Sequence, residues 1–272
     1  GAPANLSSLT ANLSGMNLPY LNSNNIYSFA VGATVSNSIL TGDFAVSKNR
    51  VTQWNIEAEV INSSIISSSG NIAVNATDNS SIYSGAGALS TDTSSSKFLA
   101  GLAAGAAVSS NSFTGQTLAL IDSSTISGTD SQYGVAVTAA SNKLIGAAAV
   151  GAEVNGTLTL GTSVVLNSIT DTVNAAISGK NRSSLITCPG GLSVQSTEQS
   201  TIGAGAGQVA FSTSAYLAAG AAAAVNTITE NVSSSIADAT VVANSGSVWN
   251  GYLNFQIFWT KVIAENSTMM AV

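Results

Sequence analysis

The chain has 272 residues, of which 45% are hydrophobic and only 7% are charged, against about 25% charged in an average soluble domain. It contains no histidine, and its seven Lys and Arg residues are scattered. Histidine-based catalysis, histidine metal sites and a nucleic-acid-binding surface are therefore excluded. The single cysteine, Cys188, cannot form an intrachain disulfide, and we interpret it as structural.

The first 28 residues differ from the rest of the chain. They carry two of the three prolines and the tract "NSNN", so residues 1–28 are predicted to form an irregular N-terminal segment or cap. The chain opens on "GAPANLSSLT" without Met and shows no basic region followed by an apolar run. This fits a processed chain or an excised fragment.

Four related segments then recur along the chain. They are "GATVSNSILT" at 32–41, "GAAVSSNSFT" at 105–114, "GTSVVLNSIT" at 161–170 and "GAAAAVNTIT" at 220–229. Their first glycines lie 73, 56 and 59 residues apart. The segments place glycines and asparagines at matching positions, which are Gly32, Gly105, Gly161 and Gly220, and Asn37, Asn111, Asn167 and Asn226.

Two further segments follow in the same order in the first three units. One alternates apolar and polar residues, as in "GNIAVNATDNSSI" at 70–82, and the other is a small-residue run such as "GAGAGQVAF" at 203–211. Alternation with a period of two residues predicts strands, and frequent Ser, Thr, Asn and Gly predict turns. The stretch "LAAGAAAAVNTIT" at 217–229 has helical propensity, but its place in the repeat predicts a strand. It is too short for a membrane helix, which needs about 20 apolar residues.

This pattern predicts an all-β protein built as a parallel β-solenoid, with about four repeats of about 60 residues over residues 29–248. We expect each repeat to hold about two or three coils that stack at roughly 4.8 Å. A narrow interior explains the small residues, with 217–229 as an inward-facing strand. The asparagines are predicted either to stack as a hydrogen-bonded ladder or simply to serve as turn residues.

The last segment, 249–272, holds "WNGYLNFQIFWTKVIAENSTMMAV" with several large aromatic residues. Open ends of a solenoid expose strand edges that natural proteins cover. This segment is therefore predicted to be a terminal coil, a cap or an assembly segment.

The repeats resemble those of large bacterial surface exoproteins, as in "GAAAAVNTITENVSSSIADATV" followed by "GAGAG"-type runs. The families are filamentous-haemagglutinin-type and leukotoxin-type β-helix adhesins, and the resemblance covers roughly residues 30–248. It implies a right-handed parallel β-helix that is secreted and displayed at the cell surface. The chain departs from these families because it shows neither a secretion-domain signature at its start nor membrane-barrel strands at its end, which leaves the export route open.

Paired carboxylates could still support chemistry on polysaccharides. Glu57 and Glu59 share one face of a predicted strand, and we interpret them as solvent-facing, with Ile56, Ala58 and Val60 facing inward. Six further acidic residues are interpreted as solvated turn residues spread among the repeats, namely Asp78, Asp122, Asp171, Glu198, Glu230 and Asp238.

No cofactor, metal or catalytic residue is predicted. The calcium-binding nonapeptide pattern is absent, and "GAGAG" is a close-packing run rather than a phosphate loop. An ice-binding face would need Thr-x-Thr tripeptides that recur in register, and no such recurrence is expected.

The sequence thus predicts a non-enzymatic extracellular protein that forms a surface stalk, fibre or filament. Its expected partners are copies of itself stacked end to end or neighbouring repeats of a longer chain, and surface glycans. No nucleic acid and no transmembrane segment are expected. The alternatives are a glycan-binding or polysaccharide-cleaving β-helix and a viral or phage fibre.

Overall fold

A computed structural model describes residues 25–36, 40–67, 70–93, 102–154, 158–212, 217–243 and 248–268, the last of these as backbone only. Every regular element within these residues is a β-strand. Residues 1–24 and Asn37 lie outside the described residues. Of the predicted N-terminal segment, residues 25–28 belong to a strand. The described residues contain no helix long and apolar enough to cross a membrane.

The strands form two long sheets and one short sheet. Sheet A contains β1 (Asn25–Ser36), β4 (Ile72–Asp78), β5 (Ser81–Asp92), β8 (Val135–Val154), β11 (Leu192–Ser212) and β14 (Val248–Thr268). Sheet B contains β2 (Leu40–Ile61), β6 (Leu102–Asp122), β9 (Leu158–Ser178) and β12 (Leu217–Ile236). Sheet C contains β3 (Ser64–Ser67), β7 (Thr125–Gly128), β10 (Ser184–Thr187) and β13 (Ala239–Val242).

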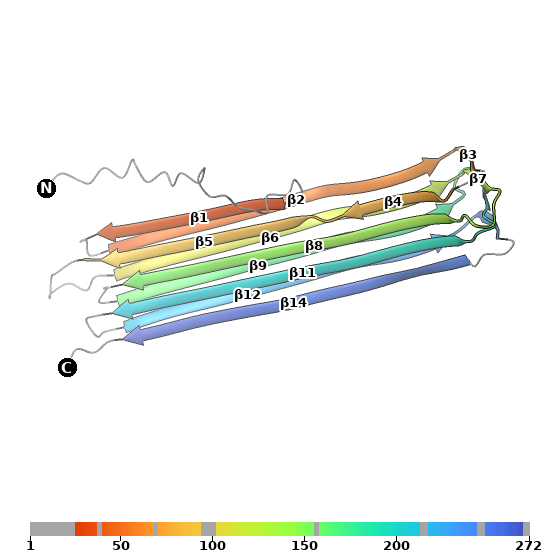
Figure 1. The fold of residues 1–272 in the computed structure, drawn as a ribbon. Coiled ribbons are helices and arrows are strands. Elements are labelled where there is room, and N and C mark those ends of the chain that lie inside the picture. Colours follow the sequence, from red (N-terminus) through yellow and green to blue (C-terminus); the bar gives the residue numbers. More distant parts are fainter. Residues whose placement is uncertain are drawn as a thin grey trace.

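The chain visits these sheets in a fixed order, from B through C to A and back to B. The long strands of sheets A and B lie on top of one another as two layers, and sheet C closes one end (Figure 1). All described strand pairs are parallel. The predicted all-β architecture with parallel, stacked sheets is therefore confirmed.

One repeat corresponds to one coil. Asparagines that face each other on neighbouring strands of sheet B are 62, 56 and 59 residues apart. The expectation of about two or three coils in each repeat is wrong, because the strands are much longer than expected. β6 and β9 each run for 21 residues, whereas an average strand has about 5–6.

The alanine-rich stretch 217–229 is a strand, as its place in the repeat predicts. It begins β12, and Gly220, Asn226 and Thr229 pair with Gly161, Asn167 and Thr170 of β9. Pairing with an existing strand overrides the helical propensity of alanine. Only alternate residues face inward, however: Ala222 and Ala224 pack on the core, whereas Ala221 and Ala223 are exposed.

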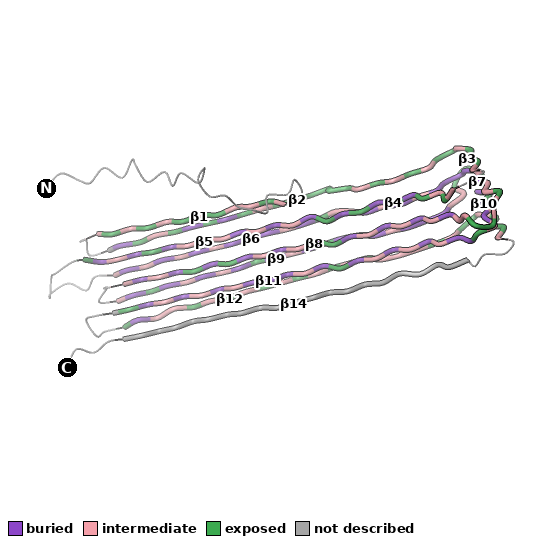
Figure 2. The backbone as a smooth tube through the Cα atoms, in the orientation of Figure 1, coloured by how far each residue is buried: buried purple, intermediate pink, exposed green. Residues whose placement is uncertain are grey.

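The interior holds two apolar clusters separated by a polar layer. One cluster lies next to sheet C and includes Ile126 and Ile186. The other lies towards the opposite ends of the long strands and includes Phe113 and Ile169. Figure 2 shows the resulting alternation of buried and more exposed residues along strands such as β6, β8 and β9. Between the clusters the inward positions are polar or charged, and these residues form most of the candidate site.

The predicted C-terminal segment continues the sheet. β14 pairs with β11 over its full length, from Leu192 opposite Val248 to Ser212 opposite Thr268. The backbone of residues 248–268 is therefore a further strand of sheet A.

Candidate functional site

Three of the four predicted asparagines lie in register on neighbouring strands of sheet B. The Asn111 side-chain amide donates to Asn167 Oδ1 at 2.8 Å, and the Asn167 amide donates to Asn226 Oδ1 at 2.9 Å. The ladder continues to Asn49, whose amide donates to Asn111 Oδ1 at 2.8 Å. Asn37 lies outside the described residues, and the position that matches Asn111 in the first coil is Asn49.

Sequence comparison missed Asn49 because the first repeat was aligned on the wrong glycine. Gly32 lies in β1 of sheet A, opposite Ala88, whereas Gly105 pairs with Asp43 of sheet B. The spacing of 62 residues between Asn49 and Asn111, close to the other intervals, is the signal that could have identified the correct register.

The glycines Gly105, Gly161 and Gly220 also lie in register. Each faces inward, towards a long polar side chain from sheet A. A Cβ atom on Gly105 would lie 2.5 Å from Glu153 Oε1, and one on Gly161 or Gly220 would overlap the side chain of Gln208. These glycines leave room for Glu153 and Gln208 inside the solenoid. Gly32 does the same for the carboxylate of Asp43.

Glu153 and Gln208 form a buried pair. Both side chains have 0% exposure, and Gln208 Nε2 donates to Glu153 Oε2 at 2.8 Å. Burial raises the pKa of Glu153 to about 7, and the hydrogen bond from Gln208 opposes this shift. Glu153 is thus a carboxyl group that is largely protonated in mildly acidic solution.

A buried ion-pair network occupies the polar layer between the apolar clusters. Lys143 Nζ lies 2.8 Å from Asp78 Oδ2 and 2.6 Å from Asp171 Oδ2, and it donates to Ser141 Oγ at 3.0 Å. Lys143 has 0% exposure, and the two aspartates have at most 2%. Desolvation raises the pKa of Asp171, while Lys143 and Ser141 lower it.

Two further acids lie beside this network. Glu198 is fully buried and accepts a hydrogen bond from Ser200. Burial raises the pKa of Glu198, and a hydrogen bond and repulsion from Glu230 raise it further. The interpretation of Asp78, Asp171, Glu198 and Glu230 as solvated turn residues was wrong, because inward-facing strand positions collect them inside the solenoid.

Three other acidic residues lie where the sequence predicts them. Glu57 and Glu59 are exposed, and Ile56, Ala58 and Val60 pack on the core. Asp238 is an exposed residue beside a turn.

Asp122 lies at the corner that follows β6, but it is only 6% exposed. It accepts hydrogen bonds from Ser178 Oγ at 2.5 Å and from the Lys180 amide at 2.9 Å. The Ser178 bond, followed by the Lys180 bond, lowers the pKa of Asp122. This carboxylate therefore joins two neighbouring coils instead of being a solvated turn residue.

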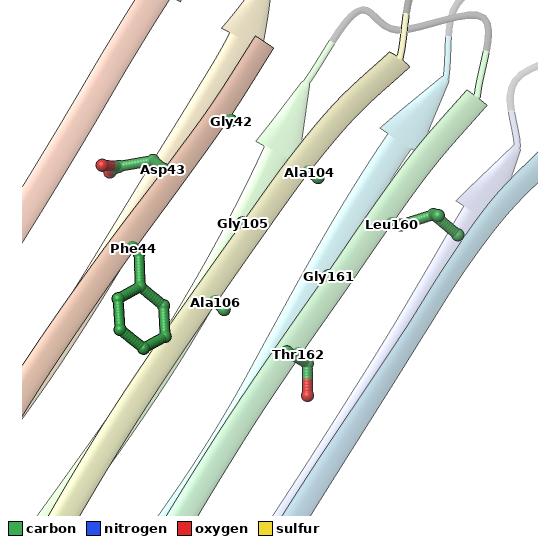
Figure 3. A pocket seen from close by; sticks show the side chains of 9 residues that line it. All are labelled: Gly42, Asp43, Phe44, Ala104, Gly105, Ala106, Leu160, Gly161 and Thr162. Carbon is green, nitrogen blue, oxygen red and sulfur yellow. The ribbon is translucent and has the colours of Figure 1, made fainter. Parts of the chain in front are cut away.

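The outer face of sheet B carries an open hollow near the beginning of its strands (Figure 3). Phe44 stands on one side, with Leu160 and Thr162 on the other, and small residues such as Ala104 and Ala106 lie between them. Phe44 is 64% exposed and Leu160 is 41% exposed. The hollow is open, and most of the residues that line it are apolar or small.

Farther along the same face, serine and threonine recur in register. Ser112 and Thr114 of β6 pair with Ser168 and Thr170 of β9, which pair with Thr227 and Thr229 of β12. Only Thr227 to Thr229 is a Thr-x-Thr tripeptide among these paired segments, so Thr-x-Thr itself does not recur in register, as expected. What recurs is a looser pattern with Ser or Thr at the first position and Thr at the third. These residues belong to the repeated segments "NSFT", "NSIT" and "NTIT". Only the strand pairing shows that the first and third residues after each asparagine, which carry the hydroxyl groups, face outward.

The described residues contain no group of three or more Cys, Asp or Glu side chains arranged to hold a metal ion. Cys188 is buried, and desolvation raises the pKa of its thiol. Comparisons with protein-family models, with curated proteins and with solved structures found no match to this chain.

Proposed function

We propose that this chain is a structural, non-enzymatic segment of an extracellular surface stalk, fibre or filament. The fold that we propose for it is a right-handed parallel β-helix with four repeats of about 60 residues, in line with intervals of 62, 56 and 59 residues. The right-handed winding and the surface location rest on the resemblance to bacterial β-helix exoproteins.

The observation that carries the proposal is that successive repeats stack along one axis. Each repeat adds an in-register strand to both long sheets, as between β6 and β9 in sheet B and between β8 and β11 in sheet A. Repeat proteins of this kind lengthen without changing their cross-section, because each coil contacts only its neighbours. A rigid rod of adjustable length suits a stalk or fibre.

The contacts inside the solenoid also support a role as a stalk or fibre. Side-chain hydrogen bonds between Asn49, Asn111, Asn167 and Asn226 join four successive coils along the axis. The ion pairs of Lys143 join residues from three different strands. Such contacts between coils resist local separation of the rod.

Negative-stain electron microscopy of the purified chain over a concentration series tests the proposal. Short rods of constant length are expected at low concentration, and longer fibres at high concentration indicate a filament rather than a stalk. Compact round particles at all concentrations would contradict the proposal. Display of the chain on the surface of a bacterium that lacks it, followed by adhesion assays, then separates a passive stalk from an adhesin.

A further inference from the structure

The strands β6, β9 and β12 are neighbours in sheet B (Figure 1). The outer face of these strands presents a regular array of hydroxyl groups. The residue between each pair of hydroxyls points inward: Phe113, Ile169 and Ile228 all belong to or pack on one apolar cluster. The flanking side chains therefore share the outward face. They form two rows across the sheet, which are Ser112, Ser168 and Thr227, and Thr114, Thr170 and Thr229.

Sheet geometry fixes the spacing of this array. Neighbouring strands lie about 4.8 Å apart, and side chains two residues apart on one strand lie roughly 6.6 Å apart. Thr172 extends the pattern by one position on β9. The result is a two-dimensional grid of hydroxyl groups with nearly constant spacing in both directions.

These hydroxyls are available to a ligand. Thr114, Thr170, Thr227 and Thr229 are exposed. The structure records no hydrogen bond from the six hydroxyls to another described part of the chain. The outward positions along this part of the three strands carry neither a charge nor an aromatic ring. They are Ser110, Ser112, Thr114 and Gln116 on β6, Leu166, Ser168, Thr170 and Thr172 on β9, and Val225, Thr227, Thr229 and Asn231 on β12.

The array has rigid support directly behind it. Asn111, Asn167 and Asn226 face inward one position before the first row, and their amide hydrogen bonds at 2.8 and 2.9 Å hold the three strands in register. Beyond the second row, the inward side of β9 carries Val173, which has 0% exposure. The spacing of the outward hydroxyls is therefore set by contacts inside the solenoid.

We propose that this face of β6, β9 and β12 binds ice. Hydroxyl groups, together with the methyl groups of the threonines, on an evenly spaced grid hold water molecules at positions that match a plane of the ice lattice. Charged groups would instead order water around themselves. A carbohydrate-binding face is the main competitor, but stacking on sugars uses aromatic side chains. The outward positions of these three strands carry none, and Trp54, which is exposed, lies on the neighbouring β2 opposite Gly115. This activity is independent of the proposed role as a stalk.

The test measures thermal hysteresis and incorporation of the fluorescently labelled chain into a growing ice hemisphere. We expect the wild-type chain to show both. Thr170→Lys places a charge at the centre of the array and should reduce both signals several-fold. Thr229→Lys, at the edge strand β12, is the second variant in case the central substitution disturbs folding.

Asn142→Lys is the matched control, because Asn142 is exposed on β8 of sheet A, and it should leave both signals unchanged. Circular dichroism and urea midpoints verify that all variants are folded. A folded wild-type chain without hysteresis or ice incorporation overturns the proposal, as does an equal loss in the Asn142 variant. Binding to crystalline chitin or cellulose that Thr170→Lys abolishes, without ice binding, also overturns it and assigns the face to glycans.

Discussion

The glycines in register on sheet B are explained by the side chains that face them from sheet A. Their recurrence was visible in the sequence, but the reason for it was not, because Glu153 and Gln208 lie in different segments of the chain. A methyl group at Gly161 would collide with both Glu153 Oε2 and Gln208 Nε2. The glycine is therefore required by space in the interior and not by backbone conformation.

Gly161→Ala should lower the free energy of unfolding by about 1–3 kcal/mol, which is the usual cost of overpacking a filled interior. Gly205→Ala is the matched control, because a Cβ atom there would have no atom within 4 Å. The control should stay within about 0.5 kcal/mol of the wild type. Urea unfolding monitored by circular dichroism measures both values, and equal effects would refute the steric explanation.

Lys143 balances buried carboxylates, and its removal leaves Asp78 and Asp171 without a cation. Breaking a buried ion pair by removing one partner costs about 3–5 kcal/mol. Lys143→Met should therefore destabilise the chain by an amount of this order in the same urea assay. Lys48→Met, at an exposed position, should have little effect, and a comparable loss in both variants would contradict the assignment.

Glu153 makes stability depend on pH. Its folded-state pKa of about 7 is above its ordinary value of 4.5, so its contribution is fully present below pH 4.5 and is lost as the pH rises through 7. The unfolding free energy should fall between pH 5 and 8, by an amount on the order of 3 kcal/mol from this group. Glu198, whose pKa is also raised, acts in the same direction.

Melting temperatures from pH 5 to 8 measure this dependence. Glu153→Gln should flatten the profile, because the amide cannot ionise, whereas the exposed Glu57→Gln should leave the slope unchanged. A profile that rises with pH in the wild type would show that Glu153 is not buried as described.

At the scale of the element, the periodicity of apolar residues predicted which segments form strands but did not predict how long those strands are. Alternation in segments such as 192–198 identified β11, but β11 continues unbroken to Ser212. The apparent boundary between the alternating segment and the "GAGAG" run is a change in side-chain size along one strand. Because short strands were expected, each repeat was assigned about two or three coils instead of one.

The pairing of residues between neighbouring strands was predictable only where successive repeats carry the same residue types at matching positions. Asn111, Asn167 and Asn226 stand in nearly identical segments, so their alignment followed directly from the sequence. The first coil differs, since β2 carries Asp43 where the other coils have glycine, and it has an irregularity between Val51 and Trp54. The cluster around Lys143 could not be predicted at all, because it joins residues from β4, β8 and β9.

At the scale of the whole molecule, the described part of sheet A has one more level of long strands than sheet B. β1, β5, β8, β11 and β14 follow one another in sheet A, and β2, β6, β9 and β12 do so in sheet B. Suppose that β1 of a second copy paired with β14 of the first copy. The β2 strand of the second copy would then be separated from β12 of the first copy by a gap one strand wide. End-to-end stacking that keeps both sheets continuous therefore needs an additional strand beside β12.

The measurement that tests the account most directly is the distance between equivalent residues of successive repeats. Spin labels at the exposed residues Thr114 and Thr170 should lie on adjacent strands, with backbones about 4.8 Å apart. Labels at Thr114 and Thr229 should lie two strands apart, at roughly 10 Å. Both pairs are placed in a Cys188→Ala background.

Continuous-wave electron paramagnetic resonance should show strong spin–spin broadening for the first pair and clearly weaker broadening for the second. That result would establish that each repeat is a single coil and that sheet B grows by one strand per repeat. Broadening that is absent from the first pair, or equal in the two pairs, would contradict the arrangement on which the ladders, the rod and the hydroxyl array all depend.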